Sequence, residues 1–235
     1  MRDRGVISTS PARAASRRSS YSIDVILFTP RGKQLAALCV RAADPRARER
    51  WMLPHDDAVA GEALDLAARR VAREASGVEP AWIEQVGAFG ADLRHPTDAV
   101  LSIAFVAVVP AALVDGVNED RAWFGVSEPP VVAPRQRAML DGALEALRRR
   151  MDHAPIAFRL LPPMFTLSEL QQTYEILLGK RLHKASFRRA LQAAFLVEPT
   201  DEWRSEGRGR PAQFFRFAPR KRRGSRRGVR FDLLA

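Results

Sequence analysis

The chain has 235 residues, of which 46% are hydrophobic and 8% aromatic, so it can bury a substantial core and is not a disordered polycation. Its 38 Lys and Arg against 27 Asp and Glu leave a formal net charge of +11, which favours an anionic partner. A single cysteine, Cys39, excludes an internal disulfide and a multi-cysteine zinc site. No apolar run approaches the ~20 residues of a membrane span, and residues 1–20 lack the apolar stretch of a signal peptide. We therefore expect a soluble cytoplasmic protein with no membrane partner.

The positive charge is concentrated at the two ends of the chain. Residues 155–235 carry a net charge of +10 and residues 1–20 carry +4, whereas residues 21–154 carry −3. This asymmetry favours contact of the C-terminal third with nucleic acid or an anionic membrane, although a solvated basic surface would leave the same signature. We expect residues 1–20 to be a disordered basic arm and residues 219–235 a basic tail that contacts phosphates.

Residues 21–152 are predicted to form an α/β domain. Apolar runs predict strands at residues 21–29, 35–40, 83–89 and 100–109. Apolar stripes at helical spacing predict helices at residues 62–76 and 136–150. A turn at 30–33 and a Pro-rich loop at 127–134 join these elements. Strands that alternate with helices over about 130 residues are typical of a compact α/β domain.

Residues 153–218 are predicted to form a smaller, winged helix-turn-helix domain. The prolines of residues 151–163 favour a linker before it. Thr166 and Glu169 have the spacing of a capping box, which predicts a helix from there to residue 178. A second helix is predicted at 184–194, followed by strands at 195–204 and 212–217. Helix, turn, helix and hairpin, in this order, are the layout of a winged helix.

Polar residues gather at the start of the second helix, while Phe187 faces the core. A recognition helix meets DNA at that position, where arginine reads guanine with two hydrogen bonds and lysine or serine holds phosphate. The hairpin tip carries arginines between glycines, a pattern that fits a narrow minor groove. The residues predicted to contact double-stranded DNA are Thr166, Lys184, Ser186, Arg188, Arg189, Arg208 and Arg210. Each alone could be a solvent-exposed residue, but together on one frame they predict DNA binding.

Part of the first domain resembles the Nudix box, G-x5-E-x7-R-E-U-x-E-E-x-G-U, in which U is apolar. With Gly77 as the anchor, the first glutamate, the arginine and the middle glutamate are Glu62, Arg70 and Glu74. Val71 and Ala75 stand where two metal-binding glutamates would lie, and Asp56 replaces the first glycine. Diphosphate hydrolysis needs several carboxylates to hold Mg²⁺ and activate water. On the predicted helix only Glu74 remains, flanked by two arginines, so we expect a salt bridge, no catalytic residues and no hydrolase activity.

Residues 21–217 as a whole resemble the Nudix-related transcriptional regulators of NAD metabolism. The motifs that carry the resemblance are Phe165-Thr166-Leu167-Ser168-Glu169-Leu170-Gln171, Leu178-Gly179-Lys180, Phe187-Arg188-Arg189 and Gly209-Arg210-Pro211-Ala212. The resemblance implies an inactive Nudix-like α/β sandwich followed by a winged helix-turn-helix. It also implies a homodimer on a palindromic operator that represses genes of NAD or cofactor metabolism. The effector would be ADP-ribose or a related nucleotide in the old catalytic cleft, and no cofactor is required.

The candidate effector contacts are Trp51, Arg70, Glu74, Gln85 and Arg94. Trp51 would stack on an adenine, or else belong to the core. Arg94 and Gln85 suit phosphate and ribose, or else a surface ion pair and a strand-edge amide. An Asp-His pair common in the resembled family is replaced here by Pro134-Arg135-Gln136-Arg137.

No metal site is predicted, because the four histidines lack metal-ligand spacing: His55, His95, His153 and His183. Two alternatives to a ligand-responsive repressor stay open at this point. One is an active Nudix-type nucleotide-diphosphate hydrolase that carries a basic domain. The other is a DNA-binding regulator whose first domain has no nucleotide effector.

Overall fold

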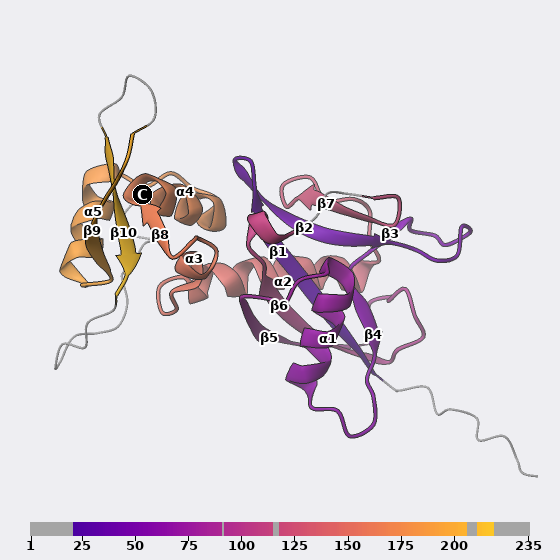
Figure 1. The fold of residues 1–235 in the computed structure, drawn as a ribbon. Coiled ribbons are helices and arrows are strands. Elements are labelled where there is room, and N and C mark those ends of the chain that lie inside the picture. Colours follow the sequence, from indigo (N-terminus) through magenta and orange to yellow (C-terminus); the bar gives the residue numbers. More distant parts are fainter. Residues whose placement is uncertain (1–20, 91, 115–117, 206–210, 219–235) are drawn as a thin grey trace, which may run out of the picture.

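The structure is a computed structural model that describes residues 21–90, 92–114, 118–205 and 211–218. The predicted basic arm at 1–20, the basic tail at 219–235 and the hairpin-tip residues Arg208 and Arg210 lie outside the described residues. Two units follow each other along the chain and are joined by one long helix (Figure 1).

The first unit is built on a mixed, seven-stranded sheet with the order β3-β2-β1-β6-β5, in which β4 pairs with β1 and β7 pairs with β2. β1 runs parallel to β6, and the other pairs are antiparallel. The strands are β1 (Tyr21–Arg31), β2 (Gln34–Arg41), β3 (Trp51–Met52), β4 (His55–Asp57), β5 (Trp82–Phe89), β6 (Leu101–Val108) and β7 (Arg121–Gly125).

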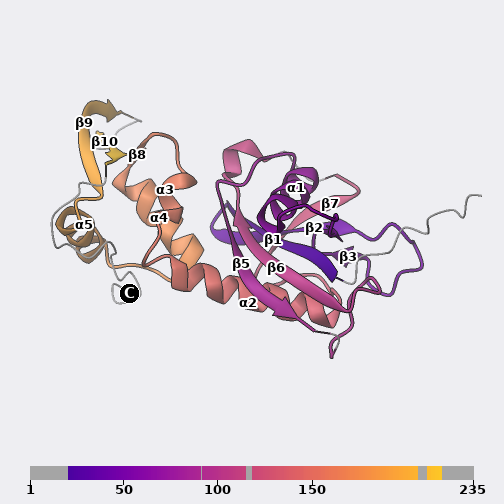
Figure 2. The ribbon, with the colours of Figure 1, turned by 90° about the horizontal axis from the view of Figure 1, so that it is seen from below.

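Two helices cover opposite faces of this sheet (Figure 2). The side chains of β1 alternate between them, since successive residues of a strand point to opposite faces. Ile23, Val25 and Leu27 pack with the helix α1 (Leu64–Ser76), whereas Ile26 and Phe28 pack with the helix α2 (Pro134–Arg150). Because β1 is buried on both faces, its residues 25–28 form a continuous apolar run rather than an alternating one. A short 3-10 helix, Ala111–Leu113, follows β6.

The second unit has the winged-helix order that the sequence predicts. Its elements are α3 (Ile156–Arg159), β8 (Met164–Thr166), α4 (Leu167–Leu178), α5 (Lys184–Ala193), β9 (Val197–Arg204) and β10 (Ala212–Phe217). β10 lies between β8 and β9 in a three-stranded antiparallel sheet. Gly179 ends α4 in the left-handed conformation, with φ of 70°, and its N–H donates to the Glu175 carbonyl.

The predicted linker at 151–163 lies between the two units, and part of it is buried. Met151, Ile156, Ala157 and Phe158 are each less than a tenth exposed and belong to one apolar cluster that runs from the sheet through α2 into α4. Prolines kept the segment from continuing α2, but its apolar residues form the short helix α3 and close the junction. The two units therefore share a core.

Further differences from the predicted elements are small. The sequence analysis did not predict the strands β3, β4, β7 and β8, all of five residues or fewer, or the helix α3. α2 begins two residues earlier than predicted, with Pro134 at its first turn, where proline is tolerated. Within the described residues, none of the helices combines the length and the apolar composition that crossing a membrane requires.

Candidate DNA interface and effector cleft

The helix α4 begins with the capping box that the sequence predicts. The Thr166 hydroxyl accepts the Glu169 N–H at 3.2 Å, and the Glu169 carboxylate accepts the Thr166 N–H at 2.7 Å and its hydroxyl at 3.0 Å. Thr166 is 6% exposed. Its hydroxyl is thus already used within the helix start, and the contact of Thr166 with DNA stays a prediction.

Glu169 also fastens the wing to α4, which the sequence analysis did not foresee. The Arg204 guanidinium at the end of β9 donates to Glu169 Oε1 at 2.6 Å and lies 4.9 Å from the Phe214 ring centroid. Burial alone would raise the pKa of Glu169, but the Thr166 hydrogen bonds and the Arg204 charge hold that pKa below its ordinary value. One ionised carboxylate therefore fixes both the first turn of α4 and the end of β9 that leads into the hairpin loop.

The helix α5 presents a buried aromatic face and an exposed basic face. Phe187 and Leu191 are fully buried, and the Phe187 ring meets the Tyr174 ring of α4 edge-on at 5.6 Å. On the other side Lys184 and Arg189 are exposed. The helix-turn-helix thus has a rigid inner surface that sets the direction of the outer cations.

The cations of α5 are largely free to bind an anion. Within the described ranges, Lys184, Arg188 and Arg189 form no ion pair, and the buried Arg188 Nε has no hydrogen-bond partner. Ser186 is half-buried, and its hydroxyl lies 3.2 Å from His183 Nδ1. A DNA phosphate or a guanine edge would supply acceptors for the exposed donors of Lys184 and Arg189.

In the first unit, three carboxylates converge on the Arg70 guanidinium of α1. Glu62 accepts two hydrogen bonds from it at 3.1 Å, Asp56 accepts one at 2.5 Å, and Glu74 lies at 3.7 Å. Hydrogen bonds to Glu62, and then to Asp56, raise the pKa of Arg70 above its ordinary value. The expected salt bridge of Arg70 with Glu74 is present. The bonds of Arg70 to Glu62 and Asp56 were not predicted, because both residues lie outside α1.

This cluster disfavours the bound Mg²⁺ that diphosphate hydrolysis requires. Mg²⁺ needs carboxylate oxygens that are free to approach it, and here a guanidinium already neutralises them. Glu74, the carboxylate with the longest contact, is also the most exposed of the three, with 61% of its side chain accessible. Val71 and Ala75, which stand where two glutamates of the Nudix box would lie, are apolar residues of α1. Val71 is buried and Ala75 is half-buried.

The other predicted effector contacts have separate partners. Trp51 is half-buried, edge-on to the Phe124 ring at 5.1 Å, with the Arg41 guanidinium 5.8 Å from its own ring centroid. Arg94 forms an ion pair with Glu49, whose side chain is 9% exposed. Gln85 is exposed on β5, the outer strand of the sheet.

A buried polar cluster links the strands β1 and β4, and the sequence analysis missed it. His95 Nε2 lies 2.9 Å from Asp24 Oδ1, and the His55 ring meets the His95 ring edge-on at 5.1 Å. Ligand atoms of Asp24, His55 and His95 lie within 4.8 Å of one another, an approach that the spacing of the histidines along the sequence does not reveal. The two histidines are 40 positions apart in the sequence, and the only sequence signal for the cluster was an aspartate next to the apolar run of β1.

Gln136 of α2 makes this cluster a hydrogen-bond network rather than a metal site. Its Oε1 accepts the Leu53 N–H at 3.0 Å, which directs its NH2 toward Asp24 Oδ1 at 3.2 Å and His55 Nδ1 at 3.4 Å. The Gln136 amide thus donates to Asp24 Oδ1, and His55 Nδ1, 2.8 Å from the Leu53 carbonyl, donates to that carbonyl oxygen, so neither atom offers a metal a free lone pair in this arrangement. Burial opposes ionisation of Asp24, but its hydrogen bond and charge interaction with His95 hold the pKa of Asp24 below its ordinary value.

Comparisons with known proteins cover both units. Residues 157–217 match the NrtR DNA-binding winged helix domain. The chain is 28% identical over 204 residues to the ADPR responsive transcriptional repressor NtrR of Acinetobacter baylyi, which spans 84% of this chain and 81% of that protein.

Two solved structures are similar to this chain over most of its length. Shewanella oneidensis NrtR complexed with a 27mer DNA matches with a TM-score of 0.68 and 28% identity, over 86% of this chain and 94% of that one. A MutT/nudix family protein from Enterococcus faecalis has the same fold, with a TM-score of 0.68 at 18% identity, over 86% of this chain and 89% of that one. The predicted fold class and the resemblance to Nudix-related regulators are thereby confirmed.

Proposed function

From the premise that this chain is a Nudix-related regulator, with an NrtR-type winged helix joined to a Nudix-like domain, we propose that it is a DNA-binding transcriptional repressor. Its first domain is the sensor and its second domain binds an operator. The genes it represses are those of NAD or cofactor metabolism.

One observation carries the DNA-binding half of this proposal. A basic face of α5, with Lys184 and Arg189 exposed and unpaired within the described residues, stands on a fully buried aromatic face. Unpaired cations on a fixed helix are what phosphate and base-edge contacts require. Lys184, Ser186, Arg188 and Arg189 are the proposed contacts on α5. Thr166, Arg208 and Arg210 remain the further proposed ones.

ADP-ribose or a related nucleotide is the proposed effector, as in the Acinetobacter baylyi relative that is ADPR responsive. The proposed contacts lie within the old Nudix box and on both sides of it along the chain: Trp51, Arg70, Glu74, Gln85 and Arg94. The half-exposed Trp51 ring offers a face for an adenine, and Arg94, with 39% of its side chain exposed, offers donors to a diphosphate.

The proposed sensor domain is catalytically inactive. Arg70 forms ion pairs with the remaining acidic side chains of the Nudix box. This supports a domain that binds the nucleotide without Mg²⁺-dependent hydrolysis of it. An active nucleotide-diphosphate hydrolase is therefore the weaker candidate. A regulator without any effector is the other, and a ligand titration separates it from the proposed one.

The proposed assembly is a cytoplasmic homodimer on a palindromic operator, since two-fold symmetric proteins read two-fold symmetric sites. The proposed domain limits are 21–152 for the sensor and 153–218 for the winged helix. The arm at 1–20 and the tail at 219–235 would add phosphate contacts without sequence preference.

The test begins with selection of bound sequences from a random duplex pool by the full-length protein. We expect one palindromic motif, bound at least 10³-fold more tightly than random DNA at about 0.15 M salt. ADP-ribose should raise the thermal unfolding midpoint of the protein, because a ligand that binds only the folded state stabilises it. The absence of an enriched motif would refute DNA recognition, and a motif without any response to ADP-ribose would leave the regulator without its proposed effector.

A further inference from the structure

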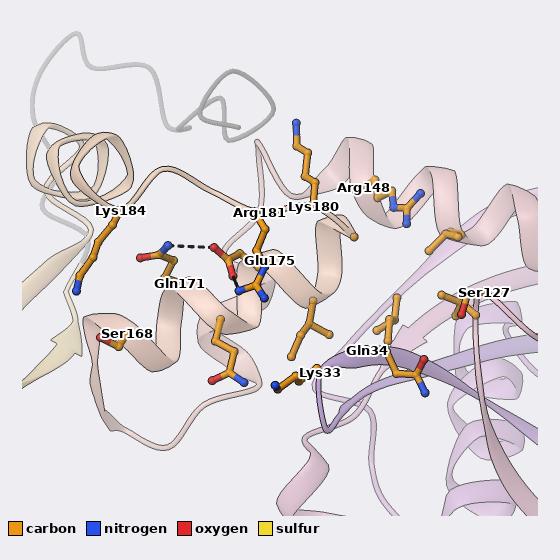
Figure 3. A pocket seen from close by; sticks show the side chains of 16 residues that line it. Lys33, Gln34, Ser127, Arg148, Ser168, Gln171, Glu175, Lys180, Arg181 and Lys184 are labelled. Carbon is orange, nitrogen blue, oxygen red and sulfur yellow. Dashed lines mark hydrogen bonds and ion pairs between the residues drawn. The ribbon is translucent and has the colours of Figure 1, made fainter. Parts of the chain in front are cut away.

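A cavity of about 760 Å³ lies where the two units meet, away from the Nudix box and from the buried histidine cluster. The turn between β1 and β2, the helix α2, the helix α4 and the connection from α4 to α5 all line it (Figure 3). Its volume lies in the range of small-molecule sites, which runs from about 300 to 1,000 Å³. Residues of both units thus form one hollow of ligand size.

Positive charge dominates the lining of this cavity. Its cationic residues lie on the β1–β2 turn, on α2, on the connection after α4 and at the start of α5. They are Lys33, Arg148, Lys180, Arg181 and Lys184. Glu175 is the one acidic side chain among the lining residues. Ser168, Gln171 and Gln172 add neutral hydrogen-bonding groups, so the cavity has the character of an anion site rather than an apolar pocket.

Glu175 does not neutralise the cavity, because its carboxylate is already engaged. It accepts the Leu182 N–H at 2.9 Å and the Gln171 amide at 3.0 Å, and Arg181 lies at 3.3 Å. Burial alone would raise the pKa of Glu175, yet these hydrogen bonds and the Arg181 charge hold that pKa below its ordinary value. Glu175 therefore positions the connection from α4 to α5.

Three of the cations have no acidic partner. Within the described part of the chain, Lys33, Arg148 and Lys184 form no ion pair, and Figure 3 shows them around the hollow, on three different segments. The exposed Arg148 side chain lies close to the end of α4. Its Nη2 lies 2.6 Å from the position that a Cβ on Gly179 would occupy, so glycine leaves the space for this approach. Unpaired cations around one hollow repel one another, and an anion between them removes that cost.

We propose that this cavity is a second ligand site, which binds the oligophosphate group of a small molecule between the sensor domain and the winged helix. A chain of phosphates carries several negative charges, so it can contact several of these lysines and arginines at once. The apolar residues of the lining, Leu35, Val126, Leu144 and Ile176, leave a surface for an attached nucleoside. A bound oligophosphate would tie the β1–β2 turn to the first residue of α5.

This inference does not depend on the ADP-ribose site. Its test is a titration without DNA, followed by a measurement of operator affinity for the same variants. Inorganic triphosphate is titrated into the full-length protein by calorimetry, without Mg²⁺, at about 0.15 M salt so that long-range attraction is screened. The site variant is the double substitution Lys33→Gln and Arg148→Gln. The control is Arg31→Gln with Arg149→Gln, which removes the same charge from neighbouring exposed positions outside the lining.

We expect one saturable site per chain, weakened by about tenfold or more in the site variant and unchanged in the control. Lys33→Gln alone should weaken binding severalfold without changing the unfolding temperature, since this exposed side chain does not support the fold. A nucleoside triphosphate should bind more tightly than inorganic triphosphate.

Equal binding by the two double variants would place the anion on the basic surface elsewhere and would overturn the proposal. Loss of operator affinity in the site variant, with triphosphate binding unchanged, would show that DNA backbone is the occupant and would also overturn it.

Discussion

The two units of this protein differ in how their charged side chains are paired. In the first, Arg70 gathers the carboxylates of Asp56, Glu62 and Glu74, so the acidic groups that a hydrolase leaves open to a metal are satisfied within the protein. In the second, Lys184 and Arg189 project from α5 unpaired within the described residues, while the acidic Glu169 is used to hold the wing. A binding site needs charges that are left unpaired, and of these two groups of residues only the cations of α5 are left so.

The two units nevertheless share one core, and this sets what can be separated by mutation. The apolar cluster runs from Phe28 through Met139 and Leu147 into Leu170 and Tyr174. A change in this cluster is expected to affect both units, whereas a change on α5 or beside Arg70 should affect one.

The largest expected effect follows from Phe187→Ala, which breaks the inner face of the DNA-binding unit. The ring is fully buried against Tyr174, and removing it should lower the free energy of unfolding by about 3–5 kcal/mol. Chemical denaturation with the circular dichroism signal measures this. Arg189→Ala, on the exposed side of the same helix, should change the free energy of unfolding by less than about 0.5 kcal/mol. Equal losses in the two variants would mean that α5 is not packed as described.

The buried network of the sensor unit gives the second prediction. Asp24→Asn should cost about 1–3 kcal/mol of unfolding free energy, because His95 and Gln136 lose a charged acceptor at a fully buried position.

The same aspartate predicts how stability depends on pH. Since the pKa of Asp24 in the folded protein lies below the ordinary 3.8, its stabilising contribution is fully present above about pH 4 and declines as pH falls through the folded pKa. The difference in unfolding free energy between wild type and Asp24→Asn should therefore shrink at low pH. A difference that stayed constant from pH 6 to pH 3 would contradict the ionised network.

Arg188→Ala tests whether the unpaired cations of α5 read DNA bases. Loss of an arginine that reads a base should weaken operator binding by about 1–3 kcal/mol while affinity for random DNA changes little. Fluorescence anisotropy with both duplexes measures the two affinities. An equal loss on random DNA would mean that Arg188 touches only phosphate.

The smallest expected effect concerns Arg204 and its bond to Glu169. Arg204→Met keeps the aliphatic contact with Phe214 but removes the ion pair, and because both partners are about one-third exposed the cost should be about 0.5–1 kcal/mol. Thermal unfolding at low and high salt checks it, since the difference from wild type should narrow as salt rises. Arg216→Met, which removes the more exposed pair with Glu198, is the matched control.

Much of the fold was predictable from the sequence because its signals are local. The apolar runs of β1 and β6, the capping box of α4 and the glycine stop at Gly179 depend on residues within a few positions of one another. The short strands β3 and β4 have no such signal, since two or three residues become a strand only by pairing with a neighbour.

The candidate sites were predictable to a smaller extent, for the same reason. The cations of α5 follow from a single helix, and so does the pair of Arg70 with Glu74. The bonds from Arg70 to Asp56 and Glu62, and the contact of His55 with His95, exist only because separate segments fold together. The junction cavity likewise joins residues more than 100 positions apart, such as Lys33 and Lys184.

The most direct test of the central claim measures DNA release and ADP-ribose hydrolysis in one sample. The full-length protein is bound to its selected duplex with Mg²⁺ present, ADP-ribose is titrated in, and anisotropy is followed while AMP and ribose 5-phosphate are assayed. We predict that ADP-ribose releases the duplex from the protein and that the ADP-ribose is recovered intact. A duplex that stays bound at saturating ADP-ribose, or ADP-ribose cleaved at an ordinary enzymatic rate, would contradict it.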